Sequence, residues 1–177
     1  RFISCLEVMR ALWQGRSVEE NRFWNIKSAQ ISPLPSHEIE VWIGSVVEKA
    51  IKRTAKLGDG WLASPGLTPD QANQAIKEYR RYCDLFDRKP LCAIRRDVYV
   101  GSSSAEAKKV VSPYIDKGYR GMSPDALVYG SVSEVAAQIQ VLEHQGFEQV
   151  IIRNISVEQD KCIETIHRFK EVKNQLA

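Results

Sequence analysis

The sequence predicts an α/β fold of about four parallel strands with helices on their outer face. Three observations predict it. Short apolar runs at 40–44, 60–64, 92–99 and 148–153 have the length of buried strands. A segment with helical periodicity follows each run, and most of the connections between them are short. The first two runs and the helix between them take fewer than about 30 residues, the usual size of a parallel βαβ unit.

The amino-terminal part of the chain has a different character. Apolar residues at helical spacing predict a helix over 2–14. In the stretch that follows, Pro33 and Pro35 exclude a central strand or a helix. We therefore expect residues 16–38 to form a loop excursion from the main fold, with room for a short hairpin around 23–31.

Composition excludes several classes of protein. The chain has 177 residues, of which 44% are hydrophobic and 27% are charged, so we interpret residues 1–177 as a single domain. The net charge of +3 is spread along the chain without a basic tract, which argues against nucleic acid as a partner. A run of about 18 apolar residues, the minimum for a membrane span, is absent from the sequence.

The four cysteines and three histidines are scattered through the sequence and form no metal-ligand spacing, so we expect no metal site. We interpret the cysteines as reduced core residues of a cytoplasmic protein. The first residue is Arg1 rather than Met, so we expect a processed protein or a piece of a longer one.

The most informative stretch runs from Val41 to Pro65, where a strand, a helix and a second strand follow one another. Gly44 allows the backbone to turn sharply and another group to come close. Ser45 lies near the predicted start of the helix, whose first N–H groups have no internal partner. This turn has the chemistry to hold a phosphate, although a simple helix cap explains the same residues.

The segments WIGS, EKAIKRTAKLGDGWL and SPG of this stretch resemble the central signature of the luciferase-like monooxygenases. The resemblance implies a flavin- or deazaflavin-dependent oxidoreductase on a (β/α)8 barrel of the TIM type. Ser45 stands where many members have a second glycine. The resemblance extends over nearly the whole chain, and the order of elements matches the C-terminal half of such a barrel. A complete barrel typically needs about 250 residues, so the chain corresponds to strands five to eight.

The resemblance also implies a cofactor and a reaction. The cofactor is FMN, or alternatively the deazaflavin F420, and reduced flavin with dioxygen would oxidise a small organic substrate. Catalytic residues stay unassigned, because family members usually take them from the N-terminal half. The phosphate end and the remainder of the cofactor are expected to meet Gly44, Ser45, Val46, Trp61, Ala63 and Ser64. Two alternatives stay open: a non-catalytic flavin-binding or structural relative, and a generic α/β domain that binds a phosphorylated small molecule.

Charged residues interrupt the third apolar run at Arg95, Arg96 and Asp97. A central strand tolerates such charges only if they pair or line a site. Either an Arg–Asp pair supports the barrel mouth, or this end of the strand is exposed at an edge. Residues 119–130 are predicted to form a loop.

Half a barrel would leave two strand edges unpaired and an apolar face uncovered. Such a face is uncommon in a monomer. We therefore expect the chain to self-associate, most simply as a two-fold homodimer.

Overall fold

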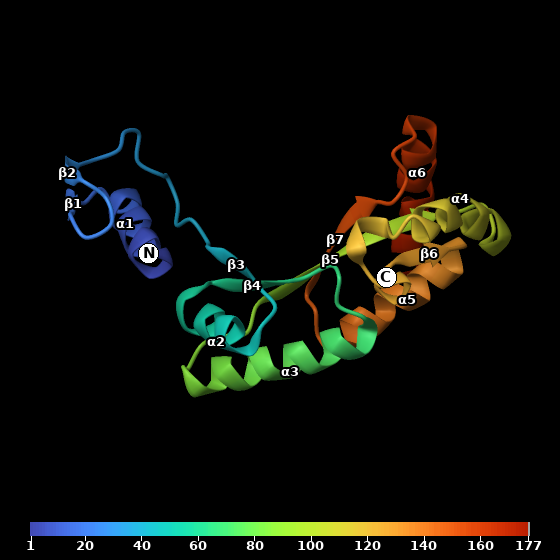
Figure 1. Cartoon of the computed structure of the whole chain (residues 1–177), viewed down its shortest axis with the longest axis horizontal. Coiled ribbons are helices and arrows are strands. Elements are labelled where there is room, and N and C mark those ends of the chain that lie inside the picture. Colours follow the sequence, from blue (N-terminus) through green and yellow to red (C-terminus); the bar gives the residue numbers. More distant parts are fainter. Residues whose placement is uncertain (177) are drawn as a thin grey trace. The chain divides into compact units, whose positions relative to one another are not determined.

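The computed structural model describes residues 1–176, which group into two compact units, Arg1–Glu40 and Val41–Ala177. Figure 1 shows the two units in the colours of the sequence. The assignment of residues 1–177 to a single domain stays a prediction.

The first unit contains the helix α1 (Phe2–Trp13) and an antiparallel hairpin of β1 (Val18–Glu20) and β2 (Ile26–Ala29). The helix confirms the expected one over 2–14. The hairpin lies inside the predicted excursion but begins five residues earlier than expected, at 18 instead of 23. The carboxylate of Glu20 explains the position of its turn, because it accepts hydrogen bonds from the backbone N–H groups of Phe23 and Trp24.

The second unit is a parallel sheet of five strands with helices between them. Strand β4 pairs with β3 and with β5, and β5 also pairs with β6 and β7. Every one of these pairs is parallel, which confirms the predicted βα arrangement. The elements are β3 (Trp42–Ser45), α2 (Glu48–Leu57), β4 (Gly60–Ala63), α3 (Pro69–Leu85), β5 (Cys92–Val100), α4 (Ser104–Asp116), η1 (Tyr119–Gly121), η2 (Pro124–Ala126), β6 (Val128–Gly130), α5 (Val132–Gln145), β7 (Gln149–Asn154) and α6 (Gln159–Leu176).

The sheet has five strands where the sequence predicts about four. The additional strand is β6, which lies at the end of the stretch 119–130 that the sequence predicts to be a loop. Two short helical turns, η1 and η2, and the strand β6 occupy this stretch. Strand β6 contains only three residues, which is too short to show a period of two in the sequence. Its pairing with Val98–Val100 of β5 makes it a strand.

Most helix starts follow local chemistry. The sequence places Gln71 three residues after Thr68 and Glu134 three residues after Ser131, a spacing that predicts a capping box at each helix start. The structure confirms both, because the Thr68 hydroxyl accepts from the N–H of Gln71 and the Ser131 hydroxyl accepts from the N–H of Glu134. Helix α2 differs, because its N-cap is Val47 and no side chain caps it. Ser45, which the sequence predicts near the N-cap, precedes it by two residues.

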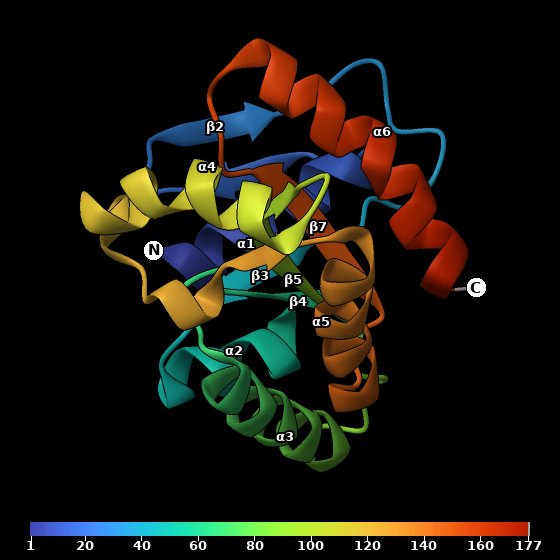
Figure 2. The ribbon, with the colours of Figure 1, turned by 90° about the vertical axis from the view of Figure 1, so that its right-hand side faces the viewer.

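The apolar core lies between the sheet and a row of helices. Figure 2 shows α2, α3, α5 and α6, each beside the next. Trp61 of β4 is fully buried there, with ring centroids 5.2 Å from Tyr79 of α3 and 6.1 Å from Phe147. Cys92 and Ile94 of β5 belong to the same cluster, so alternate residues of the strand face the helices.

The buried face of α6 differs from the predicted one. The helical spacing of apolar residues in the sequence predicts Cys162, Ile166 and Phe169 on the inner face of this helix, whereas Ile166 is 67% exposed in the structure. Thr165 and Val172 are buried instead. Hydrogen bonds of α6 to the end of β5 explain this rotation, because the Thr165 hydroxyl accepts from the N–H of Val100.

Replacing Trp61 by alanine should lower the free energy of unfolding by about 3–5 kcal/mol, because the indole is fully buried against two aromatic rings. Urea denaturation followed by circular dichroism measures this change. Leu85→Ala is the control, since Leu85 is 64% exposed and its loss should change the free energy by about 0.5 kcal/mol or less. A Trp61→Ala variant as stable as this control would contradict the packing described here.

Candidate cofactor site

The predicted site residues lie where β3 and β4 end. The two strands pair in register with Ser45 opposite Ala63, so Gly44, Ala63 and Ser64 lie at the same edge of the sheet. In parallel α/β folds this carboxyl edge is where ligands bind. The structure therefore brings five of the six predicted residues together, Gly44, Ser45, Val46, Ala63 and Ser64.

Gly44 leaves open space at this edge. A Cβ built on Gly44 would meet one atom within 4 Å, the carbonyl oxygen of Leu62 at 3.9 Å. Beyond it, Val46 is 53% exposed and Val47 is 66% exposed at the start of α2. The first N–H groups of a helix have no partner within the helix and carry its positive dipole end. The turn is thus open to an anionic group.

The side chain of Ser45 is buried and already has a partner. The Thr54 hydroxyl donates to the carbonyl of Ala50 at 2.9 Å, and its oxygen lies 3.0 Å from Oγ of Ser45. Ser45 is consequently the donor in that second bond. Its hydroxyl ties the strand end to α2.

Trp61 does not lie at the open edge. Its indole is buried among the helices, and its Nε1–H donates to the carbonyl oxygen of Ser45 at 3.0 Å. The contact of Trp61 with the cofactor stays a prediction, but the indole ring does not point to the open edge. The reason is the alternation of the strand, which turns Trp61 and Ala63 toward the helices.

A buried arginine, Arg96, holds the loop that follows β4. Its Nη1 donates to the carbonyl oxygens of Pro65 at 3.1 Å and Leu67 at 2.7 Å. The side chain is 2% exposed, and burial lowers the pKa of the guanidinium to about 10. Sequence reasoning grouped Arg96 with its charged neighbours and missed this role, because the carbonyls it binds are 29 and 31 residues away.

The predicted Arg–Asp pair is present on the other face of β5. The Nε of Arg95 donates to Asp97 at 3.1 Å, and Nη1 of Arg153 lies 3.8 Å from the same carboxylate. The Tyr119 hydroxyl donates to Asp97 at 2.8 Å. Burial and this bond raise the pKa of Tyr119 to about 12. Asp97 is fully buried, so the alternative of an exposed strand end is wrong.

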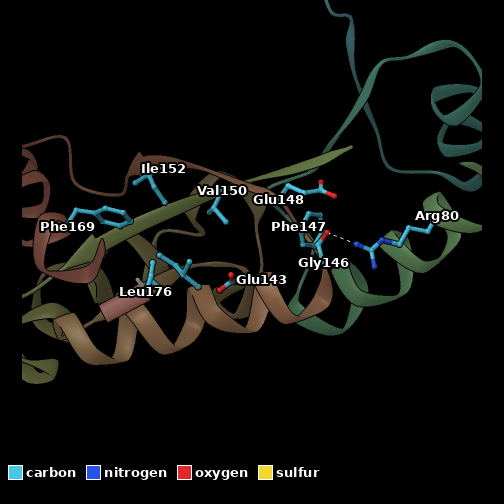
Figure 3. Close-up of a pocket in the computed structure, with 10 residues that line it drawn as sticks. Arg80, Glu143, Gly146, Phe147, Glu148, Val150, Ile152, Phe169 and Leu176 are labelled. Carbon is cyan, nitrogen blue, oxygen red and sulfur yellow. Dashed lines mark hydrogen bonds between the residues drawn. The ribbon is translucent and has the colours of Figure 1, made fainter. Parts of the chain in front are cut away.

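A cavity of about 620 Å³ in the second unit lies elsewhere (Figure 3). It runs along the helix side of β7, past Val150, Ile152 and Phe169. At its other end Arg80 donates to the carbonyl oxygen of Gly146 at 2.9 Å. This end lies where β7 begins, whereas the predicted residues lie where strands end. Size alone therefore does not make it the cofactor site.

Residues 1–176 contain no group of three or more His, Cys, Asp or Glu side chains arranged to hold a metal ion. None of its helices is long and apolar enough to span a membrane.

The comparison with protein families shows the family of this chain. The sequence model of the family described as luciferase-like monooxygenase matches residues 1–161. The chain belongs to the luciferase-like monooxygenase family. The match confirms the resemblance that the signature at Val41–Pro65 indicated.

Two curated relatives of this chain are uncharacterized proteins of Mycobacterium tuberculosis and Mycobacterium bovis. Each is 29% identical over 82 residues, which are 46% of this chain and 28% of the relative. Similar sequences therefore occur in mycobacteria. The descriptions of these two proteins give no activity.

Solved structures show the fold. A monooxygenase from Streptomyces bottropensis has a TM-score of 0.81 at 18% identity, over 96% of this chain and 59% of that one. The oxygenating constituent of 3,6-diketocamphane monooxygenase from Pseudomonas putida, in complex with FMN, has a TM-score of 0.76 at 14% identity, over 99% and 62%. The F420-dependent tetrahydromethanopterin reductase of Methanopyrus kandleri has a TM-score of 0.72 at 16% identity, over 93% and 60%.

The chain thus spans about 60% of the length of these solved structures. Its parallel sheet is part of a (β/α)8 barrel, as predicted. The edge formed by Gly44, Ala63 and Ser64 is accordingly part of the carboxyl end of a barrel, where active sites of this fold lie.

Replacing Tyr119 by phenylalanine should make the stability less sensitive to alkaline pH. The folded protein keeps the Tyr119 proton up to about pH 12, whereas an unfolded tyrosine loses its proton near pH 10. Stability from this group is therefore complete below about pH 10 and is lost between about pH 10 and 12. Urea denaturation at pH 8 to 11 measures the slope, which should be shallower in the variant. Tyr129→Phe is the matched control, and equal slopes in both variants would contradict the assignment.

Proposed function

We propose that this chain forms the cofactor-binding part of a flavin-dependent monooxygenase that uses dioxygen on a small organic substrate. The family match over residues 1–161 carries the proposal. The open carboxyl edge at Gly44 supports it, because a (β/α)8 barrel binds its ligands there. When bound, the reduced flavin supplies the oxygen chemistry, and the protein supplies binding, orientation and exclusion of water.

The cofactor's phosphate is proposed to bind at the turn from β3 into α2. Gly44 offers room for close approach, and the backbone N–H groups from Val46 into α2 offer donors and a positive dipole end. Ala63 and Ser64 lie beside this turn on the neighbouring strand end. The carboxylate of Glu48 lies in the first helical turn but is engaged with Tyr82 of α3, so it does not occupy the anion position.

Ser45 and Trp61 support the site without contacting the cofactor through their side chains. The Trp61 indole fixes the carbonyl of Ser45, and the Ser45 hydroxyl fixes Thr54. Both bonds hold the strand end in the position from which its backbone can meet a ligand.

FMN is the proposed cofactor, and the deazaflavin F420 is the alternative. Among the solved neighbours, one is in complex with FMN and others are named as F420-dependent. The residues that face the ring system would come largely from the remaining 40% or so of a barrel of that length. Those residues would also supply the catalytic acid or base.

A negative charge at the start of α2 should weaken binding of FMN. Val47 is the exposed N-cap of α2, and both aspartate and asparagine are good N-caps there. We expect Val47→Asp to raise the dissociation constant for FMN about tenfold, on the order of 1.4 kcal/mol, through repulsion of the phosphate. The asparagine of Val47→Asn has nearly the same shape as aspartate but carries no charge, so this variant should bind FMN like the wild type.

Titration of flavin fluorescence measures these constants, with riboflavin as the ligand that lacks the phosphate. The two variants should bind riboflavin equally. If Val47→Asp and Val47→Asn bind FMN with the same affinity, the phosphate does not lie at this turn.

The chain is also proposed to self-associate. Within the described residues β3 pairs only with β4, and β7 pairs only with β5, so each leaves an edge open. Ile151 of β7 is 45% exposed, and a lysine there places a charge on the uncovered face of this edge strand. Sedimentation velocity at micromolar concentration should detect a dimer that Ile151→Lys dissociates and the control Leu85→Lys leaves intact. A monomeric wild-type chain would refute this expectation.

A further inference from the structure

A cluster of charges lies on the face of β5 that is turned away from the apolar helices. Alternate residues of β5 such as Ile94 and Val98 pack into the helix-side core. Asp97 therefore faces the other way, and β7 places Arg153 in register directly beside it. Arg95 lies on the same face, two residues before Asp97 on the strand.

The cluster carries more positive than negative charge. Asp97 is fully buried and accepts hydrogen bonds from Arg95 and from the neutral hydroxyl of Tyr119. Nη1 of Arg153 lies 3.8 Å from the same carboxylate. The side chain of Arg95 is 30% exposed and that of Arg153 is 42% exposed. A third cation, Arg120, acts electrostatically on the Tyr119 hydroxyl. One carboxylate thus faces at least two guanidinium groups.

The guanidinium groups have donors to spare. Among the hydrogen bonds of residues 1–176, Arg95 reaches Asp97 through Nε alone, and Arg153 only approaches it, at 3.8 Å. A guanidinium presents five N–H donors in a planar fork that matches a carboxylate, sulfonate or phosphate. Asp97 holds Arg95 by one hydrogen bond and lies within ion-pair distance of Arg153, and both arginine side chains stay partly exposed.

The cluster lies near the proposed cofactor site. Tyr119 begins the short turn η1, and Met122 follows it directly. A Cβ built on Gly66 would lie 3.7 Å from the side chain of Met122 and 3.8 Å from the hydroxyl oxygen of Ser64. The loop that covers Asp97 therefore adjoins the loop at the end of β4.

We propose that Arg95 and Arg153, oriented by Asp97, form a subsite for an anionic group of the substrate. The group is a carboxylate, a sulfonate or a phosphate ester, which two arginines can grip with paired hydrogen bonds. This inference rests on the proposed function, because it places the substrate beside the cofactor. It narrows that substrate from a small organic molecule to an anionic one.

Binding of a simple anion to the whole chain tests the subsite without any cofactor. The chain is labelled with ¹⁵N-arginine and titrated with sulfate, while the Nε–H resonances of its arginines are followed by NMR. The resonances of Arg95 and Arg153 should shift and saturate. Arg153→Gln should raise the dissociation constant for sulfate at least tenfold, and Arg153→Lys, which keeps a charge, should recover most of the loss.

Arg81→Gln is the matched control, because it removes the same charge from an exposed position on α3. It should change the dissociation constant for sulfate less than twofold. Shifts that never saturate, or equal losses in Arg81→Gln and Arg153→Gln, would overturn the subsite. Circular dichroism confirms that each variant is folded, and Arg95→Gln provides the second, independent substitution.

A second measurement separates the substrate from the cofactor as the source of the anion. The ratio of dissociation constants for FMN and riboflavin should be the same in Arg153→Gln and in the wild type. A loss confined to FMN would place the cofactor phosphate on these arginines and overturn the assignment to the substrate. If the chain binds sulfate saturably but binds no flavin, the result supports the anion subsite and refutes the proposed function.

Discussion

The second unit depends on the backbone hydrogen bonds of β5, because three other strands pair with this one. Its nine residues give it the length to pair with β4 near its start, with β7 along its middle and with β6 at its end. The alternation of side chains then divides the molecule. One face of the strand belongs to the apolar core, and the other presents charge.

Arg96 and Asp97 show this division at adjacent positions. A buried cation without an acid partner is costly unless its donors are satisfied, and Arg96 meets that requirement in part through two backbone carbonyls. These bonds fix the loop after β4, which lies at the carboxyl edge of the sheet. Asp97 is buried on the opposite face and gathers Arg95, Arg153 and Tyr119. Arg96 thus positions the loop after β4, and Asp97 organises the charged face of β5.

The open carboxyl edge is built on apolar packing behind it. Trp61 fills the space between β4 and the helices, and its single polar group ends on the carbonyl of Ser45. A buried indole needs such a partner for its N–H. The geometry of the turn at Gly44 therefore depends on a residue that does not reach the turn's surface.

The sequence by itself determined the parallel strand–helix order, the capping boxes at Thr68 and Ser131 and the family, because these depend on local periodicity and short motifs. It also placed Gly44, Ala63 and Ser64 at strand ends, which is a property of chain order alone. Only the tertiary structure decided which way Trp61 faces, that β6 is a strand and that Arg153 joins Asp97. Each of these depends on a partner far away in the sequence, and a single-chain pattern carries no signal of which distant residue lies on the facing strand or helix.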